Sequence, residues 1–301
     1  MDHDEPLSGR RASAHGASES REIINMARKR DANQRYHDRI AGRYEAIYDD
    51  AYWQWHDALT WDYLKPHLPA DLSSPVLDLG CGSGKWGRKL LKSGYRVTFV
   101  DLSHQMLDAA RLQVAQSGGE DRALFVQADL VDLAALPANH FGLAVAMGEP
   151  IGLAADPSLA MRQIARCLAP GGRLVATFDN RIACVDHYAE RGESRELEQF
   201  LRNGRTRWLT RDAAERFEIH TFEPRQLRRL AEAGGFEVLE MLGKTVLPMR
   251  RYREQLAEPA DRRRWAQIER RLARDPDNFA RCAHLQIAAR LNTPPSPDSE
   301  P

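Results

Sequence analysis

Three carboxylates and a run of glycines occur at spacings that suit the binding of a nucleotide. Residues 76–84 read Val-Leu-Asp-Leu-Gly-Cys-Gly-Ser-Gly, so Asp78 lies inside a short apolar run that leads into three alternate glycines. Glycine there lets the backbone approach a ligand closely and take positive φ. Asp101 ends the next apolar run, and Asp129 ends the one after that. Around one cavity, we expect Asp78 to meet an ammonium group, Asp101 two ribose hydroxyls and Asp129 an adenine amino group.

The elements that must hold these groups are alternating strands and helices. A strand over 76–79, the glycines and an amphipathic helix carrying Leu90 and Leu91 form the pattern of a nucleotide-binding βα turn. Further strands are predicted at 95–100, 124–130, 141–147, 173–178, 236–242 and 284–291, with a helix at 224–233. Loops after parallel strands form the ligand crevice of open α/β sheets. Glu149 follows the fourth strand and is therefore a candidate substrate ligand or general base, although ordinary loop acids look the same.

Two cofactors fit the glycine turn. Residues 82–87 satisfy G-x-G-x-x-G, which makes a nicotinamide dinucleotide one candidate. The three acids, the glycines and the turn at 170–172 (Pro-Gly-Gly) together resemble instead the class I S-adenosylmethionine (SAM)-dependent methyltransferases over residues 36–180. The resemblance implies SAM and a Rossmann-like seven-stranded α/β sheet in the order 3-2-1-4-5-7-6, with its last strand antiparallel between the fifth and sixth. The expected cofactor-binding residues are Tyr44, Asp78, Gly80, Cys81, Gly82, Asp101, Leu102, Met106, Ala128, Asp129, Leu130 and Met147.

The segment before the core is predicted to be helical and is rich in aromatic residues. Ile40, Tyr44, Tyr48, Tyr52 and Trp55 recur at spacings of four, four, four and three, which places them on one helical stripe. These side chains either pack on the core or, as the resemblance implies, form an N-terminal lid (21–70) that closes over SAM. Tyr48 and Tyr52 are then candidates for substrate binding.

The chain departs from a minimal domain of this class after residue 180. We expect a SAM-binding core over 71–180, and a remainder (181–291) with two cap insertions at 181–222 and 243–281. Arginine pairs well with carboxylate or phosphate, so we take Arg205, Arg207 and Trp208 as substrate candidates, against the alternative of a solvated surface. His187 and His220 join Glu149 as candidate bases, although surface histidines are common.

Bulk composition sets further limits. Forty-three basic and forty-three acidic residues balance, so net charge indicates neither nucleic acid nor membrane as a partner. The four cysteines are scattered without metal-ligand spacing, so no metal site is expected. No apolar run approaches the roughly 18 residues of a membrane span, and no secretory signal is visible, which favours the cytoplasm. Residues 1–20 and 292–301 are predicted to be a disordered leader and tail.

Three functions remain open. The first is in-line transfer of a methyl group from SAM to a small molecule, whose acceptor atom and identity the residues do not specify. The second is modification of a tRNA nucleoside, because residues 236–290 loosely resemble the C-terminal half of the tRNA carboxymethoxyuridine carboxyl methyltransferases. The third is SAM binding without catalysis, as in a regulatory protein. The oligomeric state is undetermined.

Overall fold

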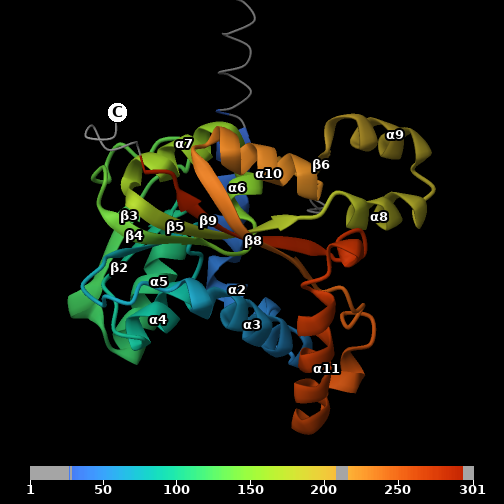
Figure 1. Cartoon of the computed structure of the whole chain (residues 1–301), viewed down its shortest axis with the longest axis horizontal. Helices are drawn as coiled ribbons and strands as arrows, with labels where there is room; N and C mark the ends of the chain where they lie inside the picture. The colour runs from blue at the N-terminus through green and yellow to red at the C-terminus, as the bar shows by residue number, and fades with distance from the viewer. Residues whose placement is uncertain (1–26, 28, 208–215, 294–301) are drawn as a thin grey trace, which may run out of the picture.

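A seven-stranded sheet forms the centre of the protein (Figure 1). The computed structural model describes residue 27 and residues 29–207 and 216–293. The strand order is β3-β2-β1-β4-β5-β9-β8. The strands are β1 (Val76–Leu79), β2 (Val97–Asp101), β3 (Ala123–Gln127), β4 (Phe141–Ala146), β5 (Leu168–Asp179), β8 (Phe236–Lys244) and β9 (His284–Leu291). The first five run parallel, and β9 pairs antiparallel with both β5 and β8. The predicted order, with an antiparallel strand inserted between the fifth and sixth, is therefore confirmed.

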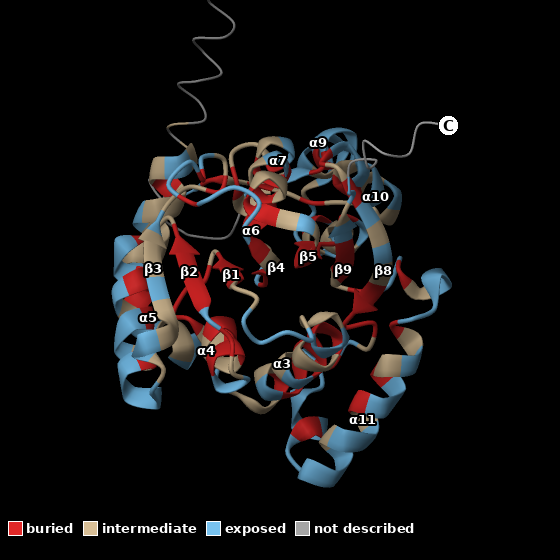
Figure 2. Cartoon of the chain, turned by 60° about the vertical axis from the view of Figure 1, so that its left-hand side comes forward, coloured by how far each residue is buried: buried red, intermediate tan, exposed pale blue. Residues whose placement is uncertain are grey.

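Both faces of this sheet are covered by helices. In Figure 2 most of the strands are buried and lie between helices whose outer surfaces are exposed. Along β1, Val76 belongs to the buried cluster on one face that includes Leu90, while Leu77 belongs to the cluster on the other face that includes Ile164. The helices of the alternating units are α4 (Lys85–Lys92), α5 (His104–Ser117), α6 (Pro150–Leu153), α7 (Pro157–Cys167) and α10 (Pro224–Ala233). Strands buried on both faces read as continuous apolar runs, which is why the sequence revealed them.

The N-terminal helices do not form the single stripe that was predicted. Residues 29–40 are helical and are followed by η1 (Ala41–Arg43), α2 (Tyr44–Ile47) and α3 (Ala51–Leu64). The chain turns between Tyr48 and Asp50, where Asp50 caps α3 by accepting a hydrogen bond from the Trp53 amide at 2.9 Å. This cap interrupts the helix, so Tyr44 and Tyr48 before it line a cavity while Tyr52 and Trp55 after it enter a buried cluster. The prediction of one continuous stripe was wrong.

Two segments add elements outside the seven-stranded sheet. Residues 181–222, predicted as the first insertion, contain α8 (Val185–Ala189), α9 (Ser194–Asn203) and a hairpin of β6 (Arg205–Arg207) and β7 (Glu218–His220). Residues 243–281, predicted as the second insertion, contain η6 (Arg253–Leu256), α11 (Pro259–Leu272) and η7 (Pro276–Asn278). η4 (Ile182–Cys184) and two further short 3-10 helices, η2 (Lys65–His67) and η3 (Glu120–Arg122), connect larger elements.

Arginines of the second insertion fasten it to α3. Arg253 pairs with Asp50 at 3.0 Å, Arg270 pairs with Asp62, and Arg262 donates to Gln54 at 2.8 Å. Figure 1 shows α11 beside α3. The arginine-rich composition of this insertion therefore serves in part to hold the two helices together. No helix in the described part of the chain has the length and apolar character needed to cross a bilayer.

Candidate active site

The glycine turn after β1 depends on backbone that side chains would obstruct. Gly80, Gly82 and Gly84 have φ of 60°, 54° and 82°, in the left-handed region that favours glycine. A Cβ on Gly80 would also lie 2.4 Å from the Cβ of Pro150, and one on Gly82 would lie 3.3 Å from the Tyr44 ring. The turn is therefore a narrow cradle of bare backbone between β1 and α4.

Two of the predicted acids hold this turn in place. An oxygen of Asp78 accepts the Gly87 amide at 2.7 Å, and Asp101 accepts the amides of Gly82 at 2.8 Å and Ser103 at 2.9 Å. Burial raises the pKa of Asp78 to about 7 and also raises the pKa of Asp101. Both carboxylates thus fix the backbone that a ligand would meet.

A small cavity of about 70 Å³ lies beside the turn, at the carboxyl ends of β1 to β3. Asp101 and Asp129 both line it, as do most of the predicted cofactor residues: Tyr44, Gly80, Gly82, Leu102, Ala128, Leu130 and Met147. The expectation that three acids border one cavity fails for Asp78, which is 1% exposed and lines neither this cavity nor its neighbour, because its carboxylate faces α4. Met106 lines neither cavity and is buried in a small cluster with Ile40 and Ala41.

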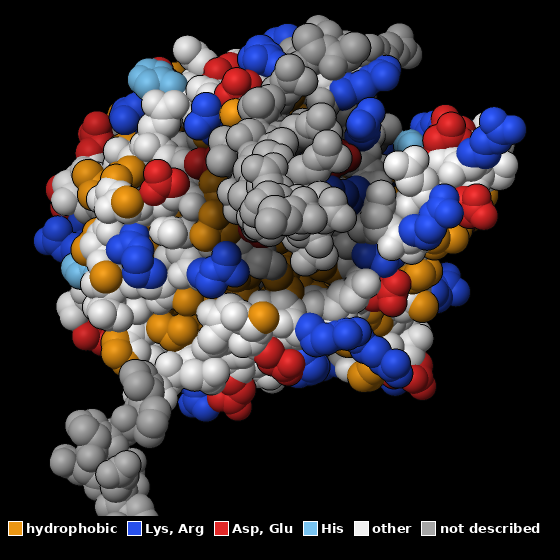
Figure 3. Space-filling view, turned by 90° about the horizontal axis from the view of Figure 1, so that it is seen from above, with side chains coloured by type: hydrophobic (Ala, Val, Ile, Leu, Met, Phe, Trp, Pro, Cys, Tyr) orange, Lys and Arg blue, Asp and Glu red, His pale blue; other side chains and the backbone are white. Residues whose placement is uncertain are grey.

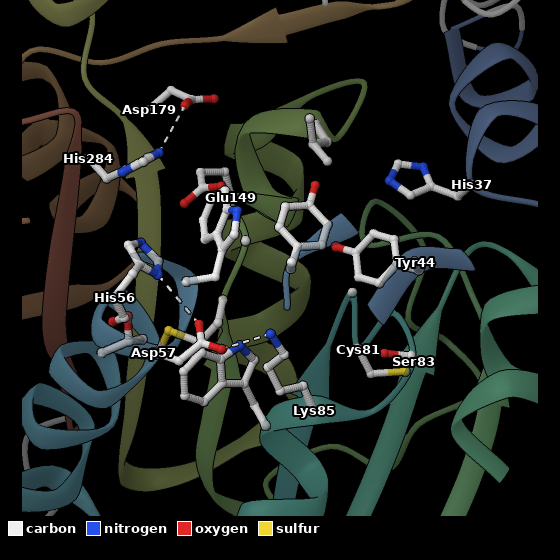
Figure 4. Close-up of a pocket in the computed structure, with 18 of the residues that line it drawn as sticks. His37, Tyr44, His56, Asp57, Cys81, Ser83, Lys85, Glu149, Asp179 and His284 are labelled. Atoms are coloured by element: carbon white, nitrogen blue, oxygen red, sulfur yellow. Dashed lines mark hydrogen bonds and ion pairs between the residues drawn. The ribbon is translucent and has the colours of Figure 1, made fainter. Parts of the chain in front are cut away.

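A larger cavity of about 290 Å³ adjoins the first (Figure 4). The two share His37, Tyr44, Gly80, Met147, Gly148 and Leu153 in their walls. Cys81 and Ser83 of the glycine turn line one side, and Tyr48 and Trp53 add aromatic surface. Tyr52, a predicted substrate residue, lies outside this cavity, because the turn before α3 directs it into a buried cluster with Leu242.

Of the three candidate bases, only Glu149 lines the larger cavity. It has φ of 61°, and its amide and that of Gly148 donate to the hydroxyl of Thr177 on β5 at 3.3 and 3.0 Å. His187 lines a separate open groove between α8, α9 and the hairpin. His220 borders none of these cavities, and burial lowers its pKa to about 4.

The predicted arginines also lie elsewhere. Arg205 and Arg207 line the same groove as His187, about 490 Å³ in volume. Arg205 pairs there with Glu218 at 3.5 Å, across the β6–β7 hairpin. Trp208 lies outside the described residues. The hairpin reaches the larger cavity through Phe217 and Ile219 instead, because these apolar side chains pack inward while the arginines face solvent.

Several polar residues of the larger cavity were not predicted. His56, Asp57 and Thr60 come from α3, and Asp179, His284 and Lys244 from the ends of β5, β9 and β8. The last three are cross-strand partners, with His284 between the other two. His284 Nε2 lies 3.8 Å from an oxygen of Asp179, while Asp57 forms an ion pair with Lys85 at 2.7 Å. Their positions at strand ends on the ligand edge were the signal that could have revealed them.

One group among the described residues has a spacing that suits a metal ion. Ligand atoms of Glu149, Asp179 and His284 all lie within 4.8 Å of one another. Lys244 and Arg250 line the same cavity, and their positive charges oppose a divalent cation there.

Comparisons with known proteins agree with this architecture. A family model described as "Methyltransferase domain" matches residues 76–172. The ubiquinone biosynthesis O-methyltransferase of Thiobacillus denitrificans is 30% identical over 174 residues, covering 58% of this chain and 69% of that protein. The enzyme of the same name from Aromatoleum aromaticum is 28% identical over 174 residues, covering 58% and 68%.

Solved structures share the fold. A SAM-dependent methyltransferase from Methanosarcina mazei superimposes with a TM-score of 0.56 at 18% identity, covering 77% of this chain and 98% of that one. The [4+2]-cyclase SpnF does so with 0.53 at 21% identity, covering 79% and 81%. Fold and turn together define a nucleotide-binding α/β protein of the methyltransferase type. The chain belongs to the class I SAM-dependent methyltransferases, it is an enzyme, and SAM is its cofactor.

The residues present fit that cofactor. The turn offers bare backbone that a Cβ at Gly80 or Gly82 would obstruct, and Asp101 and Asp129 supply carboxylates in the adjoining cavity. An acid at the end of the second strand also suits a dinucleotide, so it is the match to a methyltransferase family model and to methyltransferase relatives that favours SAM over a nicotinamide dinucleotide.

Proposed function

We propose that this methyltransferase acts on a small-molecule acceptor held in the larger cavity. The observation that carries the proposal is that the two cavities adjoin: they share Gly80 of the glycine turn and Met147 and Gly148 of the β4 exit loop. Tyr36, Tyr44 and Tyr48 from the N-terminal helices, with Phe217 from the hairpin, enclose the larger one. About 290 Å³ is a volume for a ligand of modest size.

The chain's own residues position the reactants. SAM, when bound, supplies an electrophilic sulfonium methyl group. We assign the ribose contact to Asp101 and the adenine contact to Asp129, which line the smaller cavity. Tyr44 borders both cavities and serves as part of the lid, excluding water and fixing the angle of approach.

Glu149 is the proposed proton acceptor. Its backbone is held by Thr177, and its side chain faces the larger cavity between the glycine turn and the His284 side (Figure 4). A hydroxyl acceptor benefits from a general base by about 10²- to 10⁴-fold. The O-methyltransferase names of the relatives favour an oxygen acceptor, and the Trp53 and Phe217 rings favour one that carries an aromatic ring.

The surface favours this function over tRNA modification. Basic and acidic side chains are interspersed on the face shown in Figure 3. Arg205, Arg251 and Arg290 each lie beside a glutamate. Recognition of RNA requires a continuous basic surface, which favours the small-molecule acceptor here.

The decisive experiment combines binding with transfer. Calorimetry should show binding of SAM and its demethylated product, S-adenosylhomocysteine, and none of NAD. Labelled methyl from SAM should then enter a small-metabolite extract and not a tRNA pool. Label in tRNA alone would replace the proposal with the second function, and SAM binding without transfer to either pool would indicate a binding protein.

A further inference from the structure

The residue proposed as the proton acceptor has an uncommon backbone conformation. Glu149 has φ of 61° and ψ of 27°, in the left-handed region that residues other than glycine rarely adopt. Gly148 before it also has positive φ, of 88°. Left-handed backbone at a residue with a Cβ raises the energy of the folded state, and it persists only where the surrounding structure enforces it. The conformation of Glu149 therefore requires a group that holds it.

Glu149 also occupies the N-cap position of α6 without capping it. A side-chain oxygen at an N-cap ordinarily accepts a hydrogen bond from one of the first helical amides. The Glu149 side chain makes no such bond, and among the described residues it has neither a hydrogen bond nor an ion pair. In Figure 4 it lies in the cavity between His284 and Tyr44. The backbone thus presents the carboxylate to the cavity and not to α6.

One buried hydroxyl holds this backbone. Thr177 on β5 is 0% exposed, and its hydroxyl oxygen accepts the amide of Gly148 at 3.0 Å and that of Glu149 at 3.3 Å. These are the two residues whose backbone is left-handed. Valine has nearly the same shape as threonine but cannot accept a hydrogen bond, so it would leave both amides without this partner. Thr177 is therefore the group that stabilises the conformation of the loop.

The other side of the same loop packs on the cofactor turn. A Cβ on Gly80 would lie 2.4 Å from the Cβ of Pro150, so Pro150 contacts the bare backbone of the turn directly. Gly148 borders both cavities, whereas Thr177 lines neither of them. The loop is fixed between the glycine turn and β5, and the Thr177 hydroxyl sets the direction in which Glu149 leaves it.

We propose that Thr177 is a positioning residue for methyl transfer: its hydroxyl keeps Glu149 left-handed, so that the carboxylate meets the acceptor hydroxyl beside the cofactor turn. This inference rests on the proposed function, because Thr177 acts through the proposed proton acceptor. As the O–C bond forms and the C–S bond breaks, the hydroxyl proton passes to Glu149, and the products are a methyl ether and S-adenosylhomocysteine. Misplacement of a reacting group by about 1 Å can lower a rate by about 10²-fold.

A double-mutant cycle tests this role. The quantity measured is the initial rate of labelled methyl transfer from saturating SAM to a small-metabolite extract at fixed concentration. Thr177→Val should lower this rate by about 10- to 100-fold. Because Thr177 acts through Glu149, the same substitution made in Glu149→Gln should change the rate by less than about twofold. Thr177→Ser keeps the hydroxyl and should retain most of the wild-type rate.

The matched control is Thr98→Val, which removes a buried threonine hydroxyl from β2 that lines neither cavity and should leave the rate unchanged. An unchanged rate in Thr177→Val, or an equal fold-loss with and without Glu149→Gln, overturns the positioning role and leaves the proposed function intact. Absence of transfer by the wild type overturns the proposed function instead. Calorimetry with S-adenosylhomocysteine reports whether each variant is folded. If Thr177→Val is not, the cycle uses Thr177→Cys, whose thiol is of similar size and accepts hydrogen bonds weakly.

Discussion

Replacement of Asp78 by asparagine should change how stability depends on pH. Burial raises the pKa of Asp78 from 3.8 to about 7. The folded protein therefore binds this proton more tightly than the unfolded chain. The contribution of this bound proton to the free energy of unfolding is fully present below about pH 4 and is lost as pH rises through 7. The difference between a pKa of 3.8 and one of about 7 corresponds to ~4 kcal/mol in the free energy of unfolding. Asp78→Asn keeps an oxygen for the Gly87 amide but cannot ionise.

The assay is urea unfolding of both proteins at pH 5 and pH 8 without cofactor. Between these values the wild type should lose about 3 kcal/mol that the variant keeps. Glu269, a buried acid that is not among the groups acting on Asp78, is present in both proteins and cancels in the comparison, whereas the charge of Asp101 contributes to the raised pKa of Asp78 and is part of the effect. Asp108→Asn, which removes an exposed carboxylate from α5, should follow the wild type within about 0.5 kcal/mol.

A variant that loses stability equally at both pH values would refute this reasoning. The Asp78 carboxylate would then act only as an anchor for α4, and its ionisation would not be costly. SAM binding supplies a second comparison. If the charge of Asp78 also attracts the ammonium of SAM from beneath the turn, the variant should bind SAM about tenfold more weakly, or ~1.4 kcal/mol.

Other substitutions test the turn and the proposed base. Asp101→Asn should weaken SAM binding by about 10- to 150-fold in calorimetry, because the proposed hydrogen bonds from the ribose hydroxyls would then go to a neutral amide and not to a carboxylate. Unchanged affinity would show that Asp101 does not contact the ribose. Gly87→Ala should lower the free energy of unfolding in urea by ~1–3 kcal/mol, because the added Cβ would lie 2.1 Å from the Phe99 ring. At Gly42→Ala the added Cβ would have no atom within 4 Å, so this control should unfold near the wild-type urea concentration. Glu149→Gln should lower kcat for a hydroxyl acceptor by about 10²- to 10⁴-fold with SAM affinity retained; an unchanged kcat would show that another group takes the proton.

The sheet could be predicted because its signals are local. Strands buried on both faces are apolar runs, and the glycines of the first turn are imposed by positive φ at Gly80, Gly82 and Gly84. Helix α10 and strand β9 have the predicted bounds, since Pro224 and the paired glycines 234–235 mark the helix ends. The position of β9 in the sheet came from the family resemblance and not from local pattern.

The N-terminal helices show where local periodicity misleads. Spacings of three and four predicted that the side chains from Ile40 to Trp55 share one face of a single helix. In the structure Asp50 caps a new helix, α3, between Tyr48 and Tyr52 and so divides this segment. As a result Tyr48 lines the cavity while Tyr52 is buried elsewhere. A cap signal competes with an apolar spacing signal, and the energy of a cap, about 1 kcal/mol, is enough to decide where a helix begins.

The polar wall of the acceptor cavity depends on a register that no local pattern encodes. The Cα partners run from Phe236 with Leu291 to Val238 with Ala289, and then resume at Glu240 with Ala288, which leaves Leu239 as an extra residue in β8. Without this bulge Gly243 would face His284, and the side chain of Lys244 would lie on the opposite face of the sheet. With the bulge, Lys244 joins His284 and Asp179 in one row across three strands. The chemistry of the acceptor end is therefore set by a one-residue irregularity in an edge strand, as much as by the residue types in the row.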